Sequence, residues 1–466
     1  MTGTFFGQRS LNKNVPVTFF FPPFLAKMVF MTFNLVLIFS LLLSSCVLAQ
    51  ELPRSMKTAG FWIGRHPSAD AVIMTPQAID QFNAGLRRDK KLTKDIFTLI
   101  QDLKTENLLE DLERTVSDIA SKGYYTAKGI KTDEDYMDEI RNNMDLGGVI
   151  TGMAPRYGLV THFAPQRFLP VTEGLYAQIG DFAFDQLQNS ALDVGTPVAV
   201  VHTSADGLWY YVMTDISDGW VEAKNIALGD FNQVKEFAQD KDFVVVIRPK
   251  ADIFLNGPMT NDDDIVRMGV RLPLVSVDAG HATVKVPVMG PDGSLGLRQA
   301  FMDTGDVHTG FLEFTPRHIY QQALAMLNQP YGWGDMHGEQ DCSRFLQMVF
   351  ATVGIVLPRD SKDQAQVSNS AVDFDENSDD ASKVAAMIKA PAAYTFLVLK
   401  GHIMLYLGTV DGQPYVIHET TSYKQKIAKK EVSYDFNRVI ISDLSLGQGS
   451  KKGSLLKRVT RIVSIE

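Results

Sequence analysis

Two cysteines constrain the fold of this chain more than any other feature, because they are the only ones among 466 residues. Cys46 and Cys342 lie far apart in the sequence, and a disulfide between them would explain neither of the local patterns in which they occur. Without a disulfide framework, stability has to come from buried apolar side chains. Hydrophobic residues make up 45% of the chain, and its length predicts about three or four domains.

The residues before Cys46 are typical of an export signal. An apolar run, MVFMTFNLVLIFSLLL, covers residues 28–43, follows Lys27 and is succeeded by small residues. The sequence Leu-Ser-Ser-Cys that ends at Cys46 resembles a bacterial lipobox. That resemblance implies that Cys46 carries a lipid, becomes the first residue of the mature chain and anchors it to a membrane from outside the cytoplasm.

Two other interpretations of the N-terminal segment stay open. The residues Val47–Ala49 also suit ordinary signal-peptide cleavage before Gln50, which would release a soluble protein. Alternatively, the apolar run stays uncleaved as an anchor. Translation from Met28 or Met31 would give a shorter signal, so residues 1–49 are interpreted as a signal with a possible start-site extension. Each interpretation places the rest of the chain in the bacterial cell envelope, facing the periplasm or the exterior.

The charge balance argues against a polyanionic partner. Lys and Arg number 45 against 54 Asp and Glu, which gives a formal net charge of -9. Nucleic-acid binding requires a basic face, so no nucleic acid is expected as a partner. The chain contains no HExxH or CxxC motif, and we expect no metal or other cofactor.

Hydrophobic periodicity changes along the chain and divides it into four parts. Residues 50–165 place apolar side chains at helical spacing and predict a mainly helical domain. Residues 166–235 contain short strands separated by turn residues, a pattern that predicts a small β-barrel. Residues 236–309 repeat this pattern less clearly, and residues 310–466 predict a mixed α+β domain that carries the candidate chemistry.

Cys342 is the candidate nucleophile. Apolar residues recur at helical spacing from Phe345 to Val353, and Asp341 is placed as the N-cap of that helix, so Cys342 falls in its first turn. The free backbone N–H groups and the positive end of the helix dipole favour a thiolate at this position. A lone cysteine on a helix is also compatible with an inert, buried side chain.

Two histidines on a predicted hairpin supply the bases that a cysteine nucleophile needs. One strand runs from Gly401 to Leu407, a turn follows at Asp411, and the returning strand contains His418. His402 and His418 then lie on neighbouring strands, and strand parity allows both to face the same side. In such an arrangement one imidazole accepts the thiol proton, and the second fixes its tautomer and orientation.

Several motifs in the C-terminal part carry a family resemblance. They are Tyr331-Gly332-Trp333-Gly334, Asp341-Cys342-Ser343, Leu357-Pro358-Arg359-Asp360-Ser361, Gly401-His402 and His418. Together they resemble the NlpC/P60 cysteine peptidases, which are papain-like cell-wall hydrolases. The preceding parts are similar to the N-terminal stabilising domain and paired bacterial SH3 domains of one branch of that family. The resemblance implies a multidomain α+β fold, with SH3-like barrels at 166–235 and 236–309 and a papain-like catalytic domain at 310–466.

The activity implied by this resemblance is cleavage of the bond between the γ-carboxyl of D-glutamate and an L-diamino acid, such as diaminopimelate, in peptidoglycan stem peptides or muropeptides. Cys342 would attack the carbonyl, His402 would accept and return the proton, and His418 would orient His402. The family positions that line the substrate pocket correspond to Asp341, Ser343, Tyr331, Trp333 and Ser361. Two alternatives stay open: a non-catalytic wall-binding protein, and a Cys-His amidase that acts on another exported amide.

The first SH3 domain of the branch that this chain resembles closes one end of the cleft. This implies a preference for stems with a free N-terminal L-alanine. The ammonium of such a stem needs an acidic partner, for which Asp341 and Asp185 are the candidates. Arg344 stands where many members have glycine, and its guanidinium is expected to narrow the cleft or to pair with a substrate carboxylate.

Overall fold

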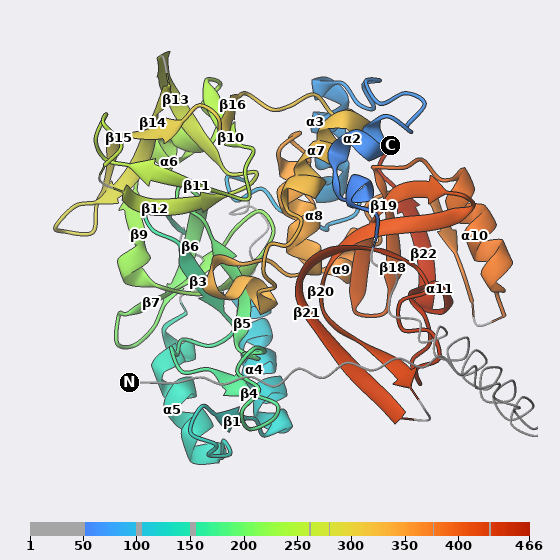
Figure 1. The fold of residues 1–466 in the computed structure, drawn as a ribbon. Helices are drawn as coiled ribbons and strands as arrows, with labels where there is room; N and C mark the ends of the chain where they lie inside the picture. The colour runs from blue at the N-terminus through green and yellow to red at the C-terminus, as the bar shows by residue number, and fades with distance from the viewer. Residues whose placement is uncertain are drawn as a thin grey trace, which may run out of the picture. The chain divides into compact units, whose positions relative to one another are not determined.

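Figure 1 shows the computed structural model, which describes residues 52–98, 105–149, 155–260, 262–278, 280–375, 377–427 and 430–466. The predictions about residues 1–49, including lipidation of Cys46, lie outside these ranges. Residues Arg54–Glu466 form one contact unit. None of the helices in the described ranges is long and apolar enough to cross a membrane.

The N-terminal part of this unit folds mainly into helices. Its elements are η1 (Arg54–Lys57), α2 (Ala59–Ile63), α3 (Pro76–Arg88), α4 (Thr105–Lys122), β1 (Tyr125–Thr126), α5 (Glu134–Met144) and η3 (Leu146–Gly148). Thr75 caps α3 by accepting the N–H of Ala78, and Asp133 caps α5 by accepting the N–H of Tyr136. Polar caps at these positions satisfy N–H groups that have no partner within the helix.

These helices pack against two different neighbours. The side-chain amide of Asn83 on α3 donates to the carbonyl of Gly354 and accepts the N–H of Val356, both in the C-terminal part. The apolar faces of α4 and α5 instead pack into a cluster with Trp220 of the first β-sheet. The segment expected as a helical domain at 50–165 therefore buries its apolar surface against separate partners.

The first β-sheet has seven antiparallel strands in the order β5-β3-β8-β7-β6-β2-β9. They are β2 (Arg156–Val160), β3 (Ala164–Arg167), β5 (Gln188–Leu192), β6 (Pro197–Thr203), β7 (Trp209–Met213), β8 (Asp218–Glu222) and β9 (Ile226–Gly229). A separate short strand, β4 (Leu175–Tyr176), pairs with β1. Since β2 pairs with both β6 and β9, the sheet begins at Arg156, ahead of the expected boundary at residue 166.

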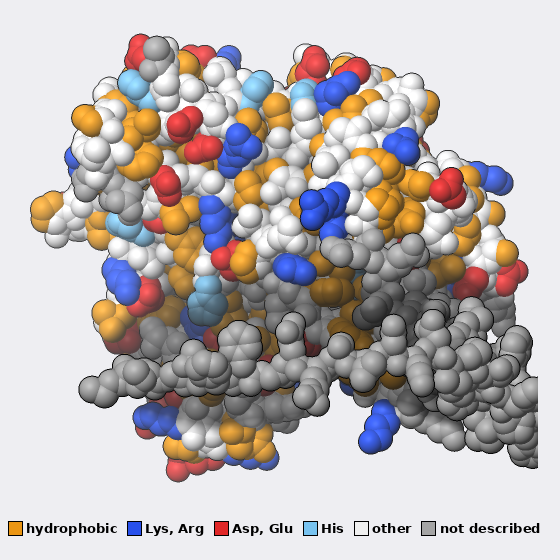
Figure 2. Space-filling view, viewed as in Figure 1, with side chains coloured by type: hydrophobic (Ala, Val, Ile, Leu, Met, Phe, Trp, Pro, Cys, Tyr) orange, Lys and Arg blue, Asp and Glu red, His pale blue; other side chains and the backbone are white. Residues whose placement is uncertain are grey.

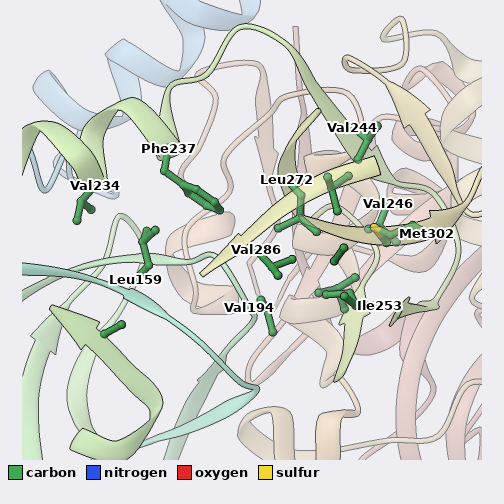
Figure 3. Packing of buried hydrophobic residues seen from close by; sticks show 14 of the residues in the cluster. Leu159, Val194, Val234, Phe237, Val244, Val246, Ile253, Leu272, Val286 and Met302 are labelled. Carbon is green, nitrogen blue, oxygen red and sulfur yellow. The ribbon is translucent and has the colours of Figure 1, made fainter. Parts of the chain in front are cut away.

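The second β-sheet follows η4 (Ala223–Asn225) and α6 (Phe231–Ala238) and also has seven strands, in the order β12-β11-β15-β14-β13-β10-β16. They are β10 (Phe243–Val246), β11 (Lys250–Phe254), β12 (Asp262–Arg267), β13 (Arg271–Asp278), β14 (His281–Met289), β15 (Leu295–Asp303) and β16 (Val307–Thr309). One buried cluster joins the two sheets, with Leu159 from the first, Phe237 from α6 and Val286 from the second (Figure 3). The two β parts therefore share a core.

The C-terminal part combines helices with a six-stranded sheet in the order β17-β22-β18-β19-β20-β21. Its elements are α7 (Pro316–Ala325), η5 (Trp333–Gly338), α8 (Cys342–Ala351), α9 (Ser361–Gln364), β17 (Ala371–Asp373), α10 (Asp380–Lys389), β18 (Thr395–Leu399), β19 (His402–Val410), β20 (Gln413–Ile427), β21 (Lys430–Asp443), α11 (Leu455–Arg458) and β22 (Val459–Ser464). Helix α8 packs against β19 and β20. The turn of the β19–β20 hairpin is formed by Asp411 and Gly412, both with positive φ.

Two glycines allow the first and second β-sheets to approach the C-terminal part closely. A Cβ on Gly269 would lie 2.6 Å from the Cβ of Ala351 on α8, and one on Gly334 would lie 2.7 Å from the carbonyl oxygen of Gln188 on β5. Both glycines also have positive φ, which side chains rarely adopt. The sequence therefore permits tight backbone contact at both places.

The visible surface carries a mixed charge distribution. On the face drawn in Figure 2, acidic and basic side chains are interspersed with apolar ones. Neither sign of charge dominates this face.

Candidate active site

Asp341 caps α8 and places Cys342 at the first helical position. Its carboxylate accepts a backbone N–H of the first turn and the hydroxyl of Ser343, both at 2.9 Å. Cys342 is partly exposed, and the backbone N–H groups of Ile403 and Ser343 lie within hydrogen-bond reach of its sulfur. Because Ile403 directly follows His402, the nucleophile lies beside the backbone that carries the candidate base.

The Cys342 thiol is not ionised at neutral pH. Burial raises its pKa to about 12, and the neighbouring Asp341 carboxylate adds to that increase. The N–H of Ile403 acts in the opposite direction but does not outweigh burial. Burial therefore opposes the thiolate that the helix N-terminus favours. A neutral thiol requires a base that accepts its proton during the attack.

His402 and His418 contact each other between β19 and β20. His402 Nε2 lies 2.8 Å from His418 Nδ1, and His418 Nε2 lies 3.1 Å from the hydroxyl oxygen of Ser442 on β21. Burial lowers the pKa of His402 to about 4 and that of His418 well below its ordinary value, so both rings are neutral near pH 7. Within the described ranges, no hydrogen bond joins the Cys342 sulfur to His402.

The contact with Ser442 was not anticipated from the sequence. Ser442 is only 8% exposed and pairs with Val416 across β20 and β21, whereas His418 pairs with Ile440. Strand parity therefore places Ser442 on the same face as His418, two residues away. The signal that could have revealed Ser442 was a polar residue directly after the apolar run Val439–Ile441, but the pairing register of β20 and β21 had to be known first.

Aromatic side chains from two parts of the chain meet beside Cys342. The ring of Phe184, which precedes β5, lies 5.6 Å from that of Trp333 and 6.4 Å from that of Tyr331. Trp333 is 36% exposed. Burial, and then the charges of Asp341 and Cys342, raise the pKa of the Tyr331 phenol, which therefore lies near the nucleophile. The first β-sheet part thus contributes to the surroundings of the catalytic residues.

The two predicted pocket serines differ in their surroundings. Ser343 is buried, donates to Asp341 and accepts a hydrogen bond from Arg359 at 3.0 Å. Ser361 is the first residue of α9 and is half-buried. Ser343 therefore supports the cap of α8, and Ser361 has the more accessible side chain of the two.

A buried network of three arginines and three aspartates connects both β-sheet parts to Asp341. The N···O distances are 2.8 Å for Arg267–Asp193, 2.9 Å for Arg344–Asp193, 3.4 Å for Arg344–Asp335, 3.5 Å for Arg267–Asp335, 3.4 Å for Arg359–Asp335 and 2.8 Å for Arg359–Asp341. The six charges balance, as buried charges must if they are to remain ionised. Among them, Asp335 is fully buried.

Arg344 belongs to this network. Its guanidinium side chain is 13% exposed and contacts Asp193 and Asp335. One guanidinium nitrogen donates to Asp193 and another donates to the amide oxygen of Gln347, so internal partners account for two of its nitrogens. Its contact with Asp193 joins α8 to the first β-sheet part.

Asp185 also has internal partners. One carboxylate oxygen accepts the N–H groups of Leu175 and Leu187, each at 3.0 Å, and the other lies 3.0 Å from Arg167. Asp185 is only 4% exposed. Both oxygens thus stabilise the segment between β4 and β5. Because both already have partners within the protein, Asp185 is not proposed to bind a substrate ammonium.

Comparisons with known proteins identify two domains. Residues 328–440 match the model of the NlpC/P60 family, and residues 175–222 match an SH3 domain of the SH3b1 type. A curated protein from Bacillus cereus, named gamma-D-glutamyl-L-lysine dipeptidyl-peptidase, is 28% identical over 199 residues, which are 39% of this chain. The match spans 55% of the length of that relative.

One solved structure shares the fold over most of both chains. A structure described as a novel NlpC/P60 endopeptidase from Photobacterium damselae subsp. piscicida aligns with a TM-score of 0.73 at 20% identity, over 88% of this chain and 96% of that one. An NlpC/P60 family protein from Bacillus cereus aligns with a TM-score of 0.42 at 21% identity, over 59% of this chain and 82% of that one.

Proposed function

This chain carries an NlpC/P60 domain preceded by an SH3 domain, and we propose that it is a cysteine peptidase of the bacterial cell envelope. Its substrate would be a peptidoglycan stem peptide, cleaved between the γ-carboxyl of D-glutamate and an L-diamino acid. The observation that supports this most is the pair of hydrogen-bonded neutral histidines beside a cysteine at a helix N-terminus. The Bacillus cereus relative is named for activity on the same class of bond.

The proposed first step is attack by the Cys342 sulfur on the γ-glutamyl carbonyl carbon. His402 Nε2 is engaged by His418, so Nδ1 of His402 is the nitrogen available to accept the thiol proton. Side-chain movement on substrate binding has to bring Nδ1 to the thiol, and catalytic contacts often tighten in this way. As the tetrahedral intermediate collapses, the C–N bond breaks and His402 gives its proton to the departing amine.

The second step is hydrolysis of the thioester. A water molecule attacks the acyl carbon while His402 Nδ1 accepts one of its protons. The C–S bond then breaks, the proton passes to the Cys342 sulfur and the γ-carboxylate of D-glutamate is released. Backbone N–H groups at the start of α8 are the proposed donors to the oxyanion in both steps.

The hydrogen-bond chain assigns a tautomer to each ring. If His402 Nδ1 accepts protons, its Nε2 must carry hydrogen and donate to His418 Nδ1. His418 then carries hydrogen on Nε2 and donates to the Ser442 oxygen, 3.1 Å away. Ser442 is thus proposed as a positioning residue that keeps His418 in the accepting tautomer.

Free N-terminal L-alanine is proposed as a feature of the preferred stems. Phe184 places the first SH3 part against Trp333, beside the nucleophile. The Asp341 side chain is 14% exposed and is the remaining candidate for contact with the substrate ammonium. Asp341 already accepts from Arg359, so this contact would add to an existing ion pair.

A defined set of stem peptides tests the proposal. Purified wild-type protein and Cys342→Ala are incubated with L-Ala-γ-D-Glu-diaminopimelate, either free or amide-linked to N-acetylmuramic acid, and products are identified by mass. We expect the wild type to release the diamino acid from the free peptide and Cys342→Ala to release none. Equal cleavage by Cys342→Ala contradicts the assignment of the nucleophile. Absence of cleavage by the wild type on every stem supports a wall-binding role or another amide substrate.

A further inference from the structure

A cavity of about 480 Å³ lies where the N-terminal helices, both β-sheet parts and α8 meet. Arg87 of α3 lines one side, and Arg344 and Gln347 of α8 line another. Neither Cys342 nor His402 lines it. Its volume falls within the range of small-molecule sites. The cavity is therefore separate from the candidate catalytic residues, although it contacts the helix that carries the nucleophile.

The cavity has aromatic walls. Phe97, Phe237, Phe243 and Phe311 line it, and they come from the N-terminal part, from α6 and from both ends of the second β-sheet part. Phe243 and Phe311 contact each other with ring centroids 4.8 Å apart. Such walls suit a ligand with an apolar body of modest size.

Arg271 contributes a cation to this lining. Its guanidinium carbon lies 3.8 Å from the ring centroid of Phe243 and 5.5 Å from that of Phe311. It donates one hydrogen bond, to the carbonyl oxygen of Asp240 at 2.8 Å. The Asp240 carboxylate itself pairs with Lys285 at 3.3 Å. Burial lowers the pKa of Arg271, and the charge of the Asp240 carboxylate acts in the opposite direction.

The other buried arginines of this region differ from Arg271. Arg267, Arg344 and Arg359 each contact at least one carboxylate within 3.5 Å. In the described part of the chain, no carboxylate oxygen lies within the 4.0 Å of an ion pair from Arg271 or from Arg87. The carboxylates of Asp240 and Asp215 act on Arg271 and Arg87, respectively, through longer-range attraction only. A bound anion within hydrogen-bond reach would therefore add to the stabilisation of both guanidinium groups.

Acidic groups also line the cavity, but most of them are engaged. Asp193 pairs with Arg344. Asp95 accepts the N–H of Phe97 at 3.0 Å. Asp215 accepts the N–H of Ile96 at 3.5 Å, and burial raises its pKa to about 6. Asp80 also lines the cavity and is exposed, and Lys94, another cation of the lining, pairs with Asp218. Arg271 and Arg87 are thus the lining cations that make no ion pair within 4.0 Å in the described ranges, and we expect them to attract a carboxylate while the acidic groups tolerate an amine.

We propose that this cavity binds a small organic carboxylate with an apolar body, of the size of an amino acid or a dipeptide, through the guanidinium groups of Arg271 and Arg87. Planar guanidinium donors match a carboxylate with two parallel hydrogen bonds, and the phenyl rings cover its apolar part. If the proposed function is correct, a released stem fragment such as L-Ala-γ-D-Glu is one natural source of this chemistry. A free amino acid is the other.

Calorimetry on the full chain carrying Cys342→Ala tests the site without any turnover. The probes are N-acetylleucine, which has a carboxylate and no amine, leucinamide, which has an amine and no carboxylate, leucine, and L-Ala-γ-D-Glu. We expect N-acetylleucine and leucine to bind and leucinamide not to bind. If L-Ala-γ-D-Glu binds and the binding depends on Arg271, a stem fragment is identified as the natural ligand. If leucine binds and L-Ala-γ-D-Glu does not, a free amino acid is identified as the natural ligand.

Second-site variants locate the binding. Arg271→Met is expected to weaken N-acetylleucine binding at least tenfold, and Arg87→Gln is expected to weaken it as well. Two controls should leave it unchanged: Arg248→Met, an arginine with a 57% exposed side chain, and Trp333→Ala, beside the nucleophile. If Arg271→Met does not fold, Arg271→Lys and Arg87→Gln decide the outcome.

Three results would overturn the proposal: no binding of any carboxylate probe at millimolar concentration, equal binding by the arginine variants, or loss of binding in Trp333→Ala. Because catalysis is absent from all of these measurements, they separate this proposal from the enzymatic one. Failure of wild-type protein to cleave stems leaves the carboxylate site intact, and loss of the site leaves the peptidase assignment intact.

Discussion

Replacing Arg344 by leucine should destabilise the protein strongly, because its guanidinium belongs to the buried network of three arginines and three aspartates. The variant leaves three buried carboxylates, those of Asp193, Asp335 and Asp341, against two guanidinium groups. The side chain of Asp193 is 3% exposed and that of Asp335 is fully buried, so water cannot replace the lost cation. Removing one partner of a buried ion pair costs about 3–5 kcal/mol. We expect a loss of that size.

Urea unfolding followed by tryptophan fluorescence measures this loss. The matched control is Arg317→Leu, which removes an arginine from an exposed pair with Asp70 and should change the unfolding midpoint little. The double variant Arg344→Leu/Asp193→Leu restores the charge balance, so it should be less destabilised than the sum of the single variants, by about 1–3 kcal/mol. If Arg344→Leu unfolds at the same urea concentration as Arg317→Leu, the network does not stabilise the contact between α8 and the β-sheets.

The remaining predictions concern catalysis. Ser442→Ala should lower kcat roughly tenfold or more with little change in KM, because His418 loses the acceptor that fixes its tautomer. Ser442→Thr should restore most of the rate. An unchanged kcat in Ser442→Ala refutes the positioning role. The value of kcat/KM should fall as the pH drops through about 4, because His402 then gains the proton that stops it from acting as a base. A fall in kcat/KM centred near pH 6.5 would contradict the burial of this ring. Alkylation of Cys342 by iodoacetamide should accelerate with pH up to at least pH 9 without a plateau, since its pKa is about 12; a plateau below pH 7 would show a stabilised thiolate. Phe184→Ala should raise KM for free stems more than it lowers kcat, whereas equal loss on free and sugar-linked stems would argue against a contribution of the first SH3 part to specificity.

Local sequence patterns predicted the elements that carry the candidate chemistry. The spacing of apolar residues after Asp341 placed the N-cap and first turn of α8, and the Asp-Gly turn placed the β19–β20 hairpin. These features depend on short-range rules of capping and strand alternation. The NlpC/P60 and SH3 resemblances, which rest on such local motifs, are confirmed by the family models.

Features that depend on distant pairs were not predictable in the same way. Asp193 and Arg267 look like ordinary surface charges in the sequence, and only the fold shows that they meet Arg344. The helix terminus at Cys342 was visible in the sequence, whereas the burial around its sulfur, which raises the pKa of the thiol, was not. Ser442 required the register of β20 against β21.

The tight approach at Gly269 and Gly334 limits how such a protein can be rearranged during evolution. Gly269, in the turn between β12 and β13, lies against Ala351 of α8, and Gly334 lies against Gln188 of β5, both at distances that admit no Cβ. A recombination event that replaced the C-terminal part would have to preserve the close contacts at Gly269 and Gly334. It would also have to preserve the buried network of three arginines and three aspartates. Inheritance of the β-sheets and the peptidase fold as one piece is therefore the simpler history.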